Sequence, residues 1–448
     1  MRPLLPLVLL ACDGKDAVDT ATDISDQILA IDGVVSVEEL EIVEGAEAAR
    51  LFRVGFEQQV DHSNPDAGTF TQWLSLIHRD ADAPMVVDTR GYGTSYSGHD
   101  NELSWLFNGN RMNIEHRFFV DSVPEPADYT LMTVTQAAAD HHAIVTAFQD
   151  LYTGPWVATG ASKGGETALF YRYFYPDDVV ATVAYVAPVL EALGDPAFTD
   201  FFDRVGTPEC RATLTTMQRT LLSYKDTLVP ALEAAAAEAG ETFTLMPASQ
   251  AFEISVAELS WTFWQYQSDC ASLPVDPTDV DAVWAWFLAS AGPPFGYADA
   301  TLSYFSPFFY QCANELGYPG LAYSEIADLL TVDPDDLTPL VPTDTLPTYN
   351  NEVVLAAAEH LMTEGETLML IYGALDPWTE RALTLSGASD SVQYLDADGN
   401  HGAGIFSLSG EDLGAAVGVL DRWVGVREDL GARVHRPRFE RETDPRRR

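Results

Sequence analysis

A serine flanked by glycines is the first feature of this sequence that could do chemistry. The stretch TGASKGGETALF, residues 159–170, holds the pattern Gly-x-Ser-x-Gly around Ser162. An apolar segment precedes it, and a run of good helix formers follows it. Glycines on both sides let a chain turn sharply from a strand into a helix and leave the serine hydroxyl at the tip of the turn. The pattern therefore predicts a nucleophile elbow with Ser162 as the nucleophile.

A serine hydroxyl needs a base to remove its proton and a carboxylate to orient that base. Asp376 directly follows the apolar run TLMLIYGAL, and His401 follows the next apolar run, in DADGNHG. The order Ser, Asp, His along the chain is the order of α/β-hydrolase triads. We predict that Ser162, Asp376 and His401 form a catalytic triad. Three nearby aspartates are weaker candidates because none directly follows a long apolar strand: Asp390, Asp396 and Asp398.

Acyl transfer also requires hydrogen-bond donors for the oxyanion that forms on the substrate carbonyl. One donor is normally the backbone N–H of the residue after the nucleophile, which here is Lys163. The second comes from a loop after an earlier strand, and the glycine-rich TRGYG follows the apolar run PMVVD. We expect Tyr92 or Gly91 to supply this donor.

These residues need a sheet to hold them. Short, partly alternating apolar runs between 34 and 80 predict an antiparallel opening sheet, and strands then alternate with helices as far as about 191. A helix-rich, aromatic segment interrupts this pattern from about 192 to 345, after which it resumes. We predict an α/β fold, an α/β-hydrolase doubly wound sheet with an inserted, mostly helical cap domain. The expected divisions are a signal segment 1–12, a polar tether 13–33, the core 34–191, the cap 192–345, the second part of the core 346–426, and an arginine-rich tail 427–448.

Composition limits the classes of partner. The chain has 448 residues and a formal net charge of -44, which argues against nucleic acids and anionic membrane surfaces because both would repel it. We expect no cofactor and no metal. Two adjacent histidines, His141 and His142, lie in a predicted helix, where neighbouring side chains point apart, so they are poor metal ligands.

The N-terminal residues predict export. One arginine is followed by an apolar run too short to span a bilayer, and the run ends in Leu-Leu-Ala-Cys at Cys12. This ending resembles a bacterial lipobox, in which the cysteine is lipidated, although a plain signal peptide remains an alternative. The protein is expected to be a cell-envelope lipoprotein or secreted. In such a protein two of the three remaining cysteines should pair: Cys210, Cys270 and Cys312.

Several longer segments together resemble a known family. They are TRGYG, EHRFF, QAAADHHAI, and the stretch from GASKGGETALF to VAYVAPV. These segments look like those of the secreted bacterial serine tripeptidyl and prolyl aminopeptidases. FEQQVDHSNP and EHRFF are also similar to segments of the more distant lysosomal prolylcarboxypeptidase and dipeptidyl peptidases. The resemblance covers about 34 to 425 and is weakest in the cap. It implies a capped α/β-hydrolase that needs no metal and cleaves near the N-terminus of short, often proline-containing peptides.

The resemblance also implies that a free peptide N-terminus binds under the cap. A protonated amine in a partly dry pocket requires a carboxylate or carbonyl partner. The cap offers Glu253, Glu258 and Asp269 near an aromatic run that includes Trp264. An equally good interpretation of most of these aromatic residues is that they form the core of the cap. Two other functions remain open, namely an esterase or lipase of the same fold and a non-catalytic surface lipoprotein.

Overall fold

A computed structural model describes residues 22–426 except 47, 291–294 and 322. Its centre is a nine-stranded sheet with the order β1-β2-β3-β5-β4-β6-β7-β10-β11. The first strands pair antiparallel, as expected, and the strands from β5 to β11 run parallel. The bounds of the strands are β1 Val34–Leu40, β2 Arg50–Gln59, β3 Thr69–His78, β4 Met85–Thr89, β5 Asn110–Ile114, β6 Trp156–Ala161, β7 Ala181–Tyr185, β10 Leu368–Gly373 and β11 Val392–Asp396.

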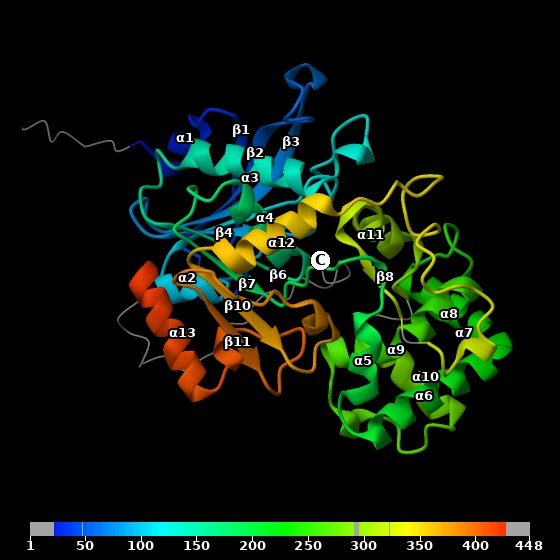
Figure 1. The fold of residues 1–448 in the computed structure, drawn as a ribbon. Helices are drawn as coiled ribbons and strands as arrows, with labels where there is room; N and C mark the ends of the chain where they lie inside the picture. Colours follow the sequence, from blue (N-terminus) through cyan, green and yellow to red (C-terminus); the bar gives the residue numbers. More distant parts are fainter. Residues whose placement is uncertain (1–21, 47, 291–294, 322, 427–448) are drawn as a thin grey trace, which may run out of the picture.

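Helices cover both faces of the sheet because its central strands are apolar on both sides. In β4, Met85 and Val87 pack into one core cluster, whereas Val86 between them packs into another. The first face carries α3 and α4, and α12 lies against α4; the second face carries α2 and α13 (Figure 1). The bounds of these helices are α2 Glu102–Phe107, α3 Val134–Phe148, α4 Lys163–Phe174, α12 Glu352–Glu364 and α13 Gly410–Trp423.

The region between β7 and α12 is helical and lies to one side of the sheet (Figure 1). We call residues 192–345 the cap. The cap includes the short strands β8 Leu193–Asp195 and β9 Tyr318–Pro319 and the helices α5 Ala197–Arg204, α6 Pro208–Ser223, α7 Lys225–Ala239, α8 Ala248–Ala257, α9 Leu259–Tyr266, α10 Val280–Ala289 and α11 Asp299–Gln311. One apolar cluster contains Ile254 and Phe309 of the cap together with Leu169 and Leu370 of the core. Cap and core therefore share buried surface.

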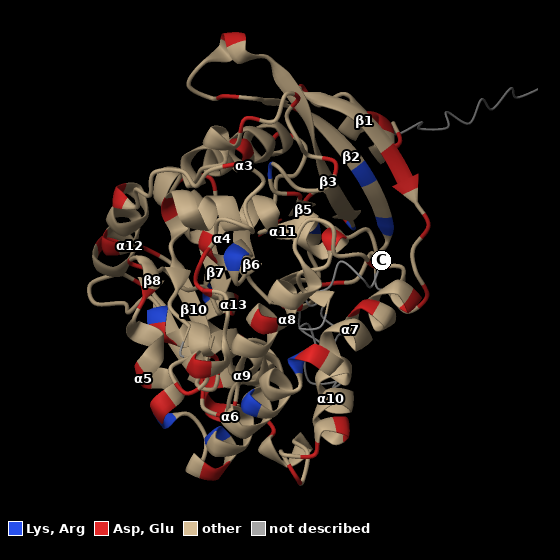
Figure 2. Cartoon of the chain, turned by 90° about the vertical axis from the view of Figure 1, so that its right-hand side faces the viewer, with Lys and Arg blue, Asp and Glu red and all other residues tan. Residues whose placement is uncertain are grey.

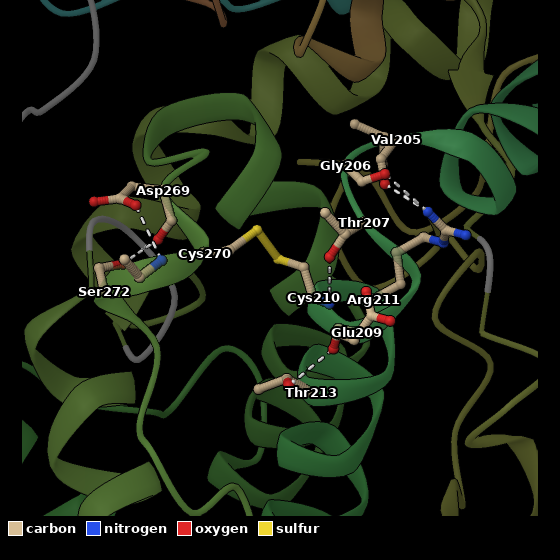
Figure 3. The surroundings of a disulfide bond; sticks show 11 residues. Val205, Gly206, Thr207, Glu209, Cys210, Arg211, Thr213, Asp269, Cys270 and Ser272 are labelled. Atoms are coloured by element: carbon tan, nitrogen blue, oxygen red, sulfur yellow. Dashed lines mark hydrogen bonds between the residues drawn. A yellow bond between two sulfur atoms is a disulfide. The ribbon is translucent and has the colours of Figure 1, made fainter.

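A disulfide crosses the cap between Cys210 at the start of α6 and Cys270 after α9 (Figure 3). Cys312 is buried and free. The sequence indicated one pair and one free thiol but not which residues pair.

One local expectation differs from the structure. The helix α1 Ile24–Leu29 lies within the expected tether and buries Ile28 against the sheet. Between Asp376 and His401 the chain forms the short 3-10 helix η7 Pro377–Arg381 and then β11.

The expected signal segment with Cys12 and the arginine-rich tail 427–448 lie outside the described residues. Acidic residues, coloured red, are spread over the core and the cap, with few basic residues, coloured blue, among them (Figure 2). Within the described ranges, no helix combines the length and apolar character needed to cross a membrane.

Candidate active site

The turn from β6 into α4 places Ser162 in a rare backbone conformation. Its φ is 55° and its ψ is −127°, and its N–H donates to the carbonyl of Tyr185 over 2.9 Å. Residues other than glycine seldom adopt a positive φ, so this turn is strained. The sequence suggested that the neighbouring glycines would take the strained conformation. In the structure the strained residue is the serine itself.

The glycines around Ser162 serve close packing. A Cβ at Gly160 would overlap the carbonyl group of Gly164, and a Cβ at Gly165 would lie 2.7 Å from the Cβ of Ala187. The helix α4 can therefore begin directly against β6 and β7 only because these positions lack side chains. A strand, a sharp turn at serine and a helix in a mostly parallel sheet are the nucleophile elbow of the α/β-hydrolase fold.

The two other predicted triad residues contact each other. Asp376 follows β10 and His401 follows β11, so both stand at the carboxyl edge of the sheet, where β6 also ends. His401 Nδ1 lies 2.7 Å from Asp376 Oδ2, and their side chains are 4% and 0% exposed. Asp376 Oδ1 also accepts the backbone N–H of Trp378 over 3.2 Å. A carboxylate held in this way fixes the imidazole ring with its other nitrogen available as a base.

Ser162 and His401 line the same cavity, and among the described residues no hydrogen bond joins their side chains. Such bonds are often long in ligand-free hydrolases and tighten when substrate binds. The carboxylate that His401 contacts is that of Asp376 and not one of the alternative aspartates. Asp390, for example, accepts the indole N–H of Trp423 over 2.8 Å.

The cap contacts the loop of His401. The backbone N–H of His401 donates to the carbonyl of Gln265 over 3.1 Å, and Asn400 Nδ2 donates to Ser268 Oγ over 3.3 Å. The ring of Tyr266 stands edge-on to His401 at 6.1 Å. These contacts come from the end of α9 and the residues after it, so the cap helps to position the loop that carries His401.

The expected oxyanion donors lie beside Ser162. Lys163 is the first residue of α4, and N–H groups in the first turn of a helix point out of its N-terminal end. The TRGYG loop packs against this turn, since a Cβ at Gly91 would lie 2.7 Å from the backbone nitrogen of Gly164. Tyr92 follows in that loop and lines the cavity that contains Ser162.

The side chain of Lys163 is buried. Its ammonium lies 5.8 Å from the centre of the Tyr92 ring and 5.7 Å from that of Phe119. Glu166 lies one turn further along α4; burial raises the pKa of its carboxyl to about 8, and the Lys163 charge acts in the opposite direction. The lysine therefore belongs to a buried charge cluster behind the elbow, in keeping with a structural role.

Two hollows meet at Ser162 and His401. A cavity of about 270 Å³ runs under the cap, and 8 of its 22 lining residues are Phe, Tyr or Trp. A second hollow of about 170 Å³ opens on the core side and is lined by polar groups that include Asp88, Arg90 and Glu102. We call them the cap cavity and the core hollow. A substrate bound across Ser162 would extend into both.

Of the four cap residues suggested as substrate ligands, only Glu258 lines the cap cavity. Glu253 is paired with Lys225 at 2.5 Å and accepts from Thr331. Asp269 is exposed and caps a 3-10 turn through the N–H of Ala271. Trp264 is 2% exposed and packs against Phe263 in the cap interior, as the interpretation as cap core anticipated.

Several residues of the cap cavity were not identified from the sequence. Tyr297 and Tyr318 surround Glu258, and Trp378 lies 6.4 Å from the His401 ring. Trp378 follows the predicted acid by two positions, which was the available signal. The two tyrosines carried no such signal, because they lie about 40 and 60 residues beyond Glu258 in a region without a recognisable motif.

Among the residues that the structure describes, no group of three or more His, Cys, Asp or Glu side chains is placed to hold a metal ion. His141 instead bonds the Ala137 carbonyl within its own helix at 2.5 Å, while His142 pairs with Asp178 at 2.7 Å.

Comparison with known proteins identifies the family. The family model described as PS-10 peptidase S37 matches residues 17–436. The prolyl tri/tetrapeptidyl aminopeptidase of Streptomyces mobaraensis is 35% identical over 413 residues, which cover 90% of this chain and 85% of that protein. The human thymus-specific serine protease is 30% identical over 38% of each chain, and the lysosomal Pro-X carboxypeptidase of Mus musculus is 26% identical over 31% of this chain and 32% of its own length. These matches confirm the resemblance that the motifs suggested, and the chain therefore belongs to the PS-10 peptidase S37 family of serine peptidases.

Proposed function

We propose that this protein is an exported serine exopeptidase that releases short peptides from the N-terminus of its substrates through a Ser162–His401–Asp376 triad. The observation that carries the proposal is the 2.7 Å contact between a fully buried Asp376 and His401, which lines the same cavity as Ser162. The name of the Streptomyces mobaraensis relative supports tripeptides or tetrapeptides ending in proline as the released product.

The chemistry follows from these positions. Ser162 Oγ attacks the scissile carbonyl carbon while His401 Nε2 takes the hydroxyl proton, and the N–H groups of Lys163 and Tyr92 stabilise the oxyanion. The C–N bond then breaks, and His401 gives its proton to the leaving amine. Water, deprotonated by His401, then attacks the acyl carbon, the bond from that carbon to Ser162 Oγ breaks, and His401 returns the proton to Oγ, so that the N-terminal peptide leaves with a new carboxylate. The acyl part would lie in the cap cavity and the leaving peptide in the core hollow.

The first test is covalent labelling. A fluorophosphonate probe should label the wild-type protein and should not label Ser162→Ala, provided that circular dichroism shows both to be folded. Labelling of the alanine variant at another serine would contradict the triad, and an unlabelled wild-type protein would favour a non-catalytic surface protein.

The second test addresses substrate class. Hydrolysis of Ala-Ala-Pro p-nitroanilide should exceed that of its N-acetylated form by at least tenfold. Equal or faster cleavage of the acetylated peptide, or of medium-chain fatty acid esters, would contradict the exopeptidase function and favour an esterase.

Export rests on two features. The Leu-Leu-Ala-Cys ending at Cys12 is typical of a lipoprotein signal, and a disulfide in the cap is typical of an oxidising compartment. Mass spectrometry of the mature protein should find a lipid-modified Cys12 at its N-terminus. An unmodified N-terminus at another residue would exclude the lipid anchor.

A further inference from the structure

Glu258 stands at the junction of α8 and α9, on the wall of the cap cavity that also contains Ser162 and His401. The hydroxyl of Tyr297 donates to its Oε1 over 2.7 Å. Tyr318 lines the cavity with Glu258 and acts to lower the pKa of the same carboxyl. Both tyrosines line the cavity, so the carboxyl is held in a fixed orientation facing the space where substrate binds.

The charges around Glu258 differ from those around Glu166 and Glu253. Glu166, the second glutamate of the cavity wall, lies beside the ammonium of Lys163, and Glu253 is paired with Lys225. Of the described residues that act on Glu258, two are neutral tyrosines and the third, Asp335, is acidic. Glu258 is therefore a carboxylate of the substrate cavity with a hydrogen-bond donor beside it, and none of the described residues that act on it is a cation.

We propose that Glu258 binds the protonated α-amino group of the peptide substrate. This inference rests on the proposed function and names the group that would confer the preference for free N-termini. An ammonium has three donors and no acceptor, so it can bind the carboxylate oxygens left by the tyrosine hydroxyls. Aromatic side chains around the cavity would surround the rest of the acyl peptide, and aromatic faces suit proline rings and cations.

A pH dependence should follow from this site. Burial raises the pKa of Glu258 to about 7, while Tyr297 and Tyr318 act to lower it. The free enzyme thus loses the negative charge as pH falls through about 7, and binding of a protonated amine weakens. Peptide α-amines lose their proton near pH 8, so binding should also weaken above that value.

The experiment compares two substrates on each enzyme. The kcat/KM for Ala-Ala-Pro p-nitroanilide is divided by the kcat/KM of the same enzyme for p-nitrophenyl acetate, which has no amine. Titration of His401 and losses of folded protein affect both substrates, so they cancel in the ratio. The wild-type ratio should peak between about pH 7 and pH 8.

Glu258→Gln should lower the ratio at pH 7.5 on the order of 100-fold, mainly through KM, because one partner of a desolvated charge pair is removed. Its ratio should no longer rise through pH 7. Asp269→Asn is the matched control: it removes the same charge from an exposed cap residue, and asparagine can still cap the turn. Its ratio should stay within twofold of wild type.

A second variant separates amine binding from a structural role. Tyr297→Phe keeps the shape of the ring and removes a donor that lowers the pKa of Glu258, so the acidic limb of the ratio should move to higher pH. Two results would overturn the inference while leaving the exopeptidase function intact. One is a Tyr297→Phe enzyme whose kcat/KM ratio rises over the same pH range as that of wild type. The other is a Glu258→Gln enzyme that still prefers free over acetylated peptides. A wild-type enzyme without that preference would instead contradict the proposed function.

Discussion

Ser162 shows how a single strained residue depends on its neighbours. A positive φ at a residue other than glycine costs about 1–3 kcal/mol, and it persists only where the surrounding packing enforces it. Here the enforcement comes from close approaches at Gly160 and Gly165, which fix α4 against β6 and β7. The strain is therefore maintained by the fold, and it holds the hydroxyl above the carboxyl edge of the sheet where Asp376 and His401 meet.

Asp376→Asn should reduce kcat by about 10⁴ while leaving the fold intact, because the amide would hold the His401 imidazole in the wrong tautomer to act as a base. Steady-state kinetics with the tripeptide anilide measures the effect. Asp398→Asn is the control, since Asp398 is an exposed alternative carboxylate close to His401 in the chain, and it should change kcat less than twofold. A large loss in the control with a small loss in Asp376→Asn would reassign the acid.

At the scale of elements, three of the motifs that carry the family resemblance contribute residues to one buried charged cluster. Arg117 of EHRFF donates to both carboxylate oxygens of Asp140 in QAAADHHAI, over 2.7 and 2.6 Å, and neither side chain is exposed. His62 of the VDH segment lies 2.8 Å from the same carboxylate. The guanidinium also donates to the backbone carbonyls of Gln59 and Val60, so it ties α3 to the end of β2. These motifs therefore stabilise the fold that holds Ser162, Asp376 and His401 in place.

Asp140→Asn should lower the free energy of unfolding by about 3–5 kcal/mol at pH 7, because it leaves the Arg117 guanidinium buried without a counter-charge. Asp121→Asn is the matched control: its partner Arg53 and the aspartate are partly exposed, so the loss should stay below about 1 kcal/mol. Urea denaturation measures both. Equal losses in the two variants would contradict this assignment.

The ion pair also has a pH dependence of known sign. Burial alone would raise the pKa of Asp140, but the Arg117 guanidinium outweighs this effect and lowers it below 3.8. The carboxylate therefore stabilises the folded state above about pH 4, and this contribution is lost as pH falls through the lowered pKa. The difference in unfolding free energy between wild type and Asp140→Asn should shrink as pH falls through this lowered pKa.

The sequence predicted those features that depend on residues close together in the chain. The elbow follows from glycine spacing around Ser162, and Asp376 and His401 follow from their positions after apolar strands. Glu258 could not be separated from Glu253 on sequence alone, since Lys225 neutralises Glu253 only after α7 packs beside α8. The disulfide pairing and the helix α1 were missed or left open for the same reason, because tertiary packing decides them.

At the scale of the whole molecule, the cap and the core are expected to unfold together. They share the apolar cluster that contains Ile254, Phe309, Leu169 and Leu370, and the cap bonds the backbone of His401. A cap that unfolded separately would expose this cluster and would release the loop that carries His401. Loss of activity and loss of tertiary structure should therefore occur over the same range of denaturant.

The disulfide gives a direct test of this coupling. It joins residues 60 positions apart, and closing a loop of that length in the unfolded chain stabilises the folded state by about 4 kcal/mol. The double variant Cys210→Ser, Cys270→Ser should lose about this much stability, and dithiothreitol should lower the stability of wild type similarly while leaving the variant unchanged.

Because cap and core share buried surface, the variant should still show one transition by tryptophan fluorescence and by activity, displaced to lower urea concentration. Two separated transitions in the variant would show that the cap unfolds on its own, and that the disulfide, rather than the shared cluster, keeps Glu258 above Ser162.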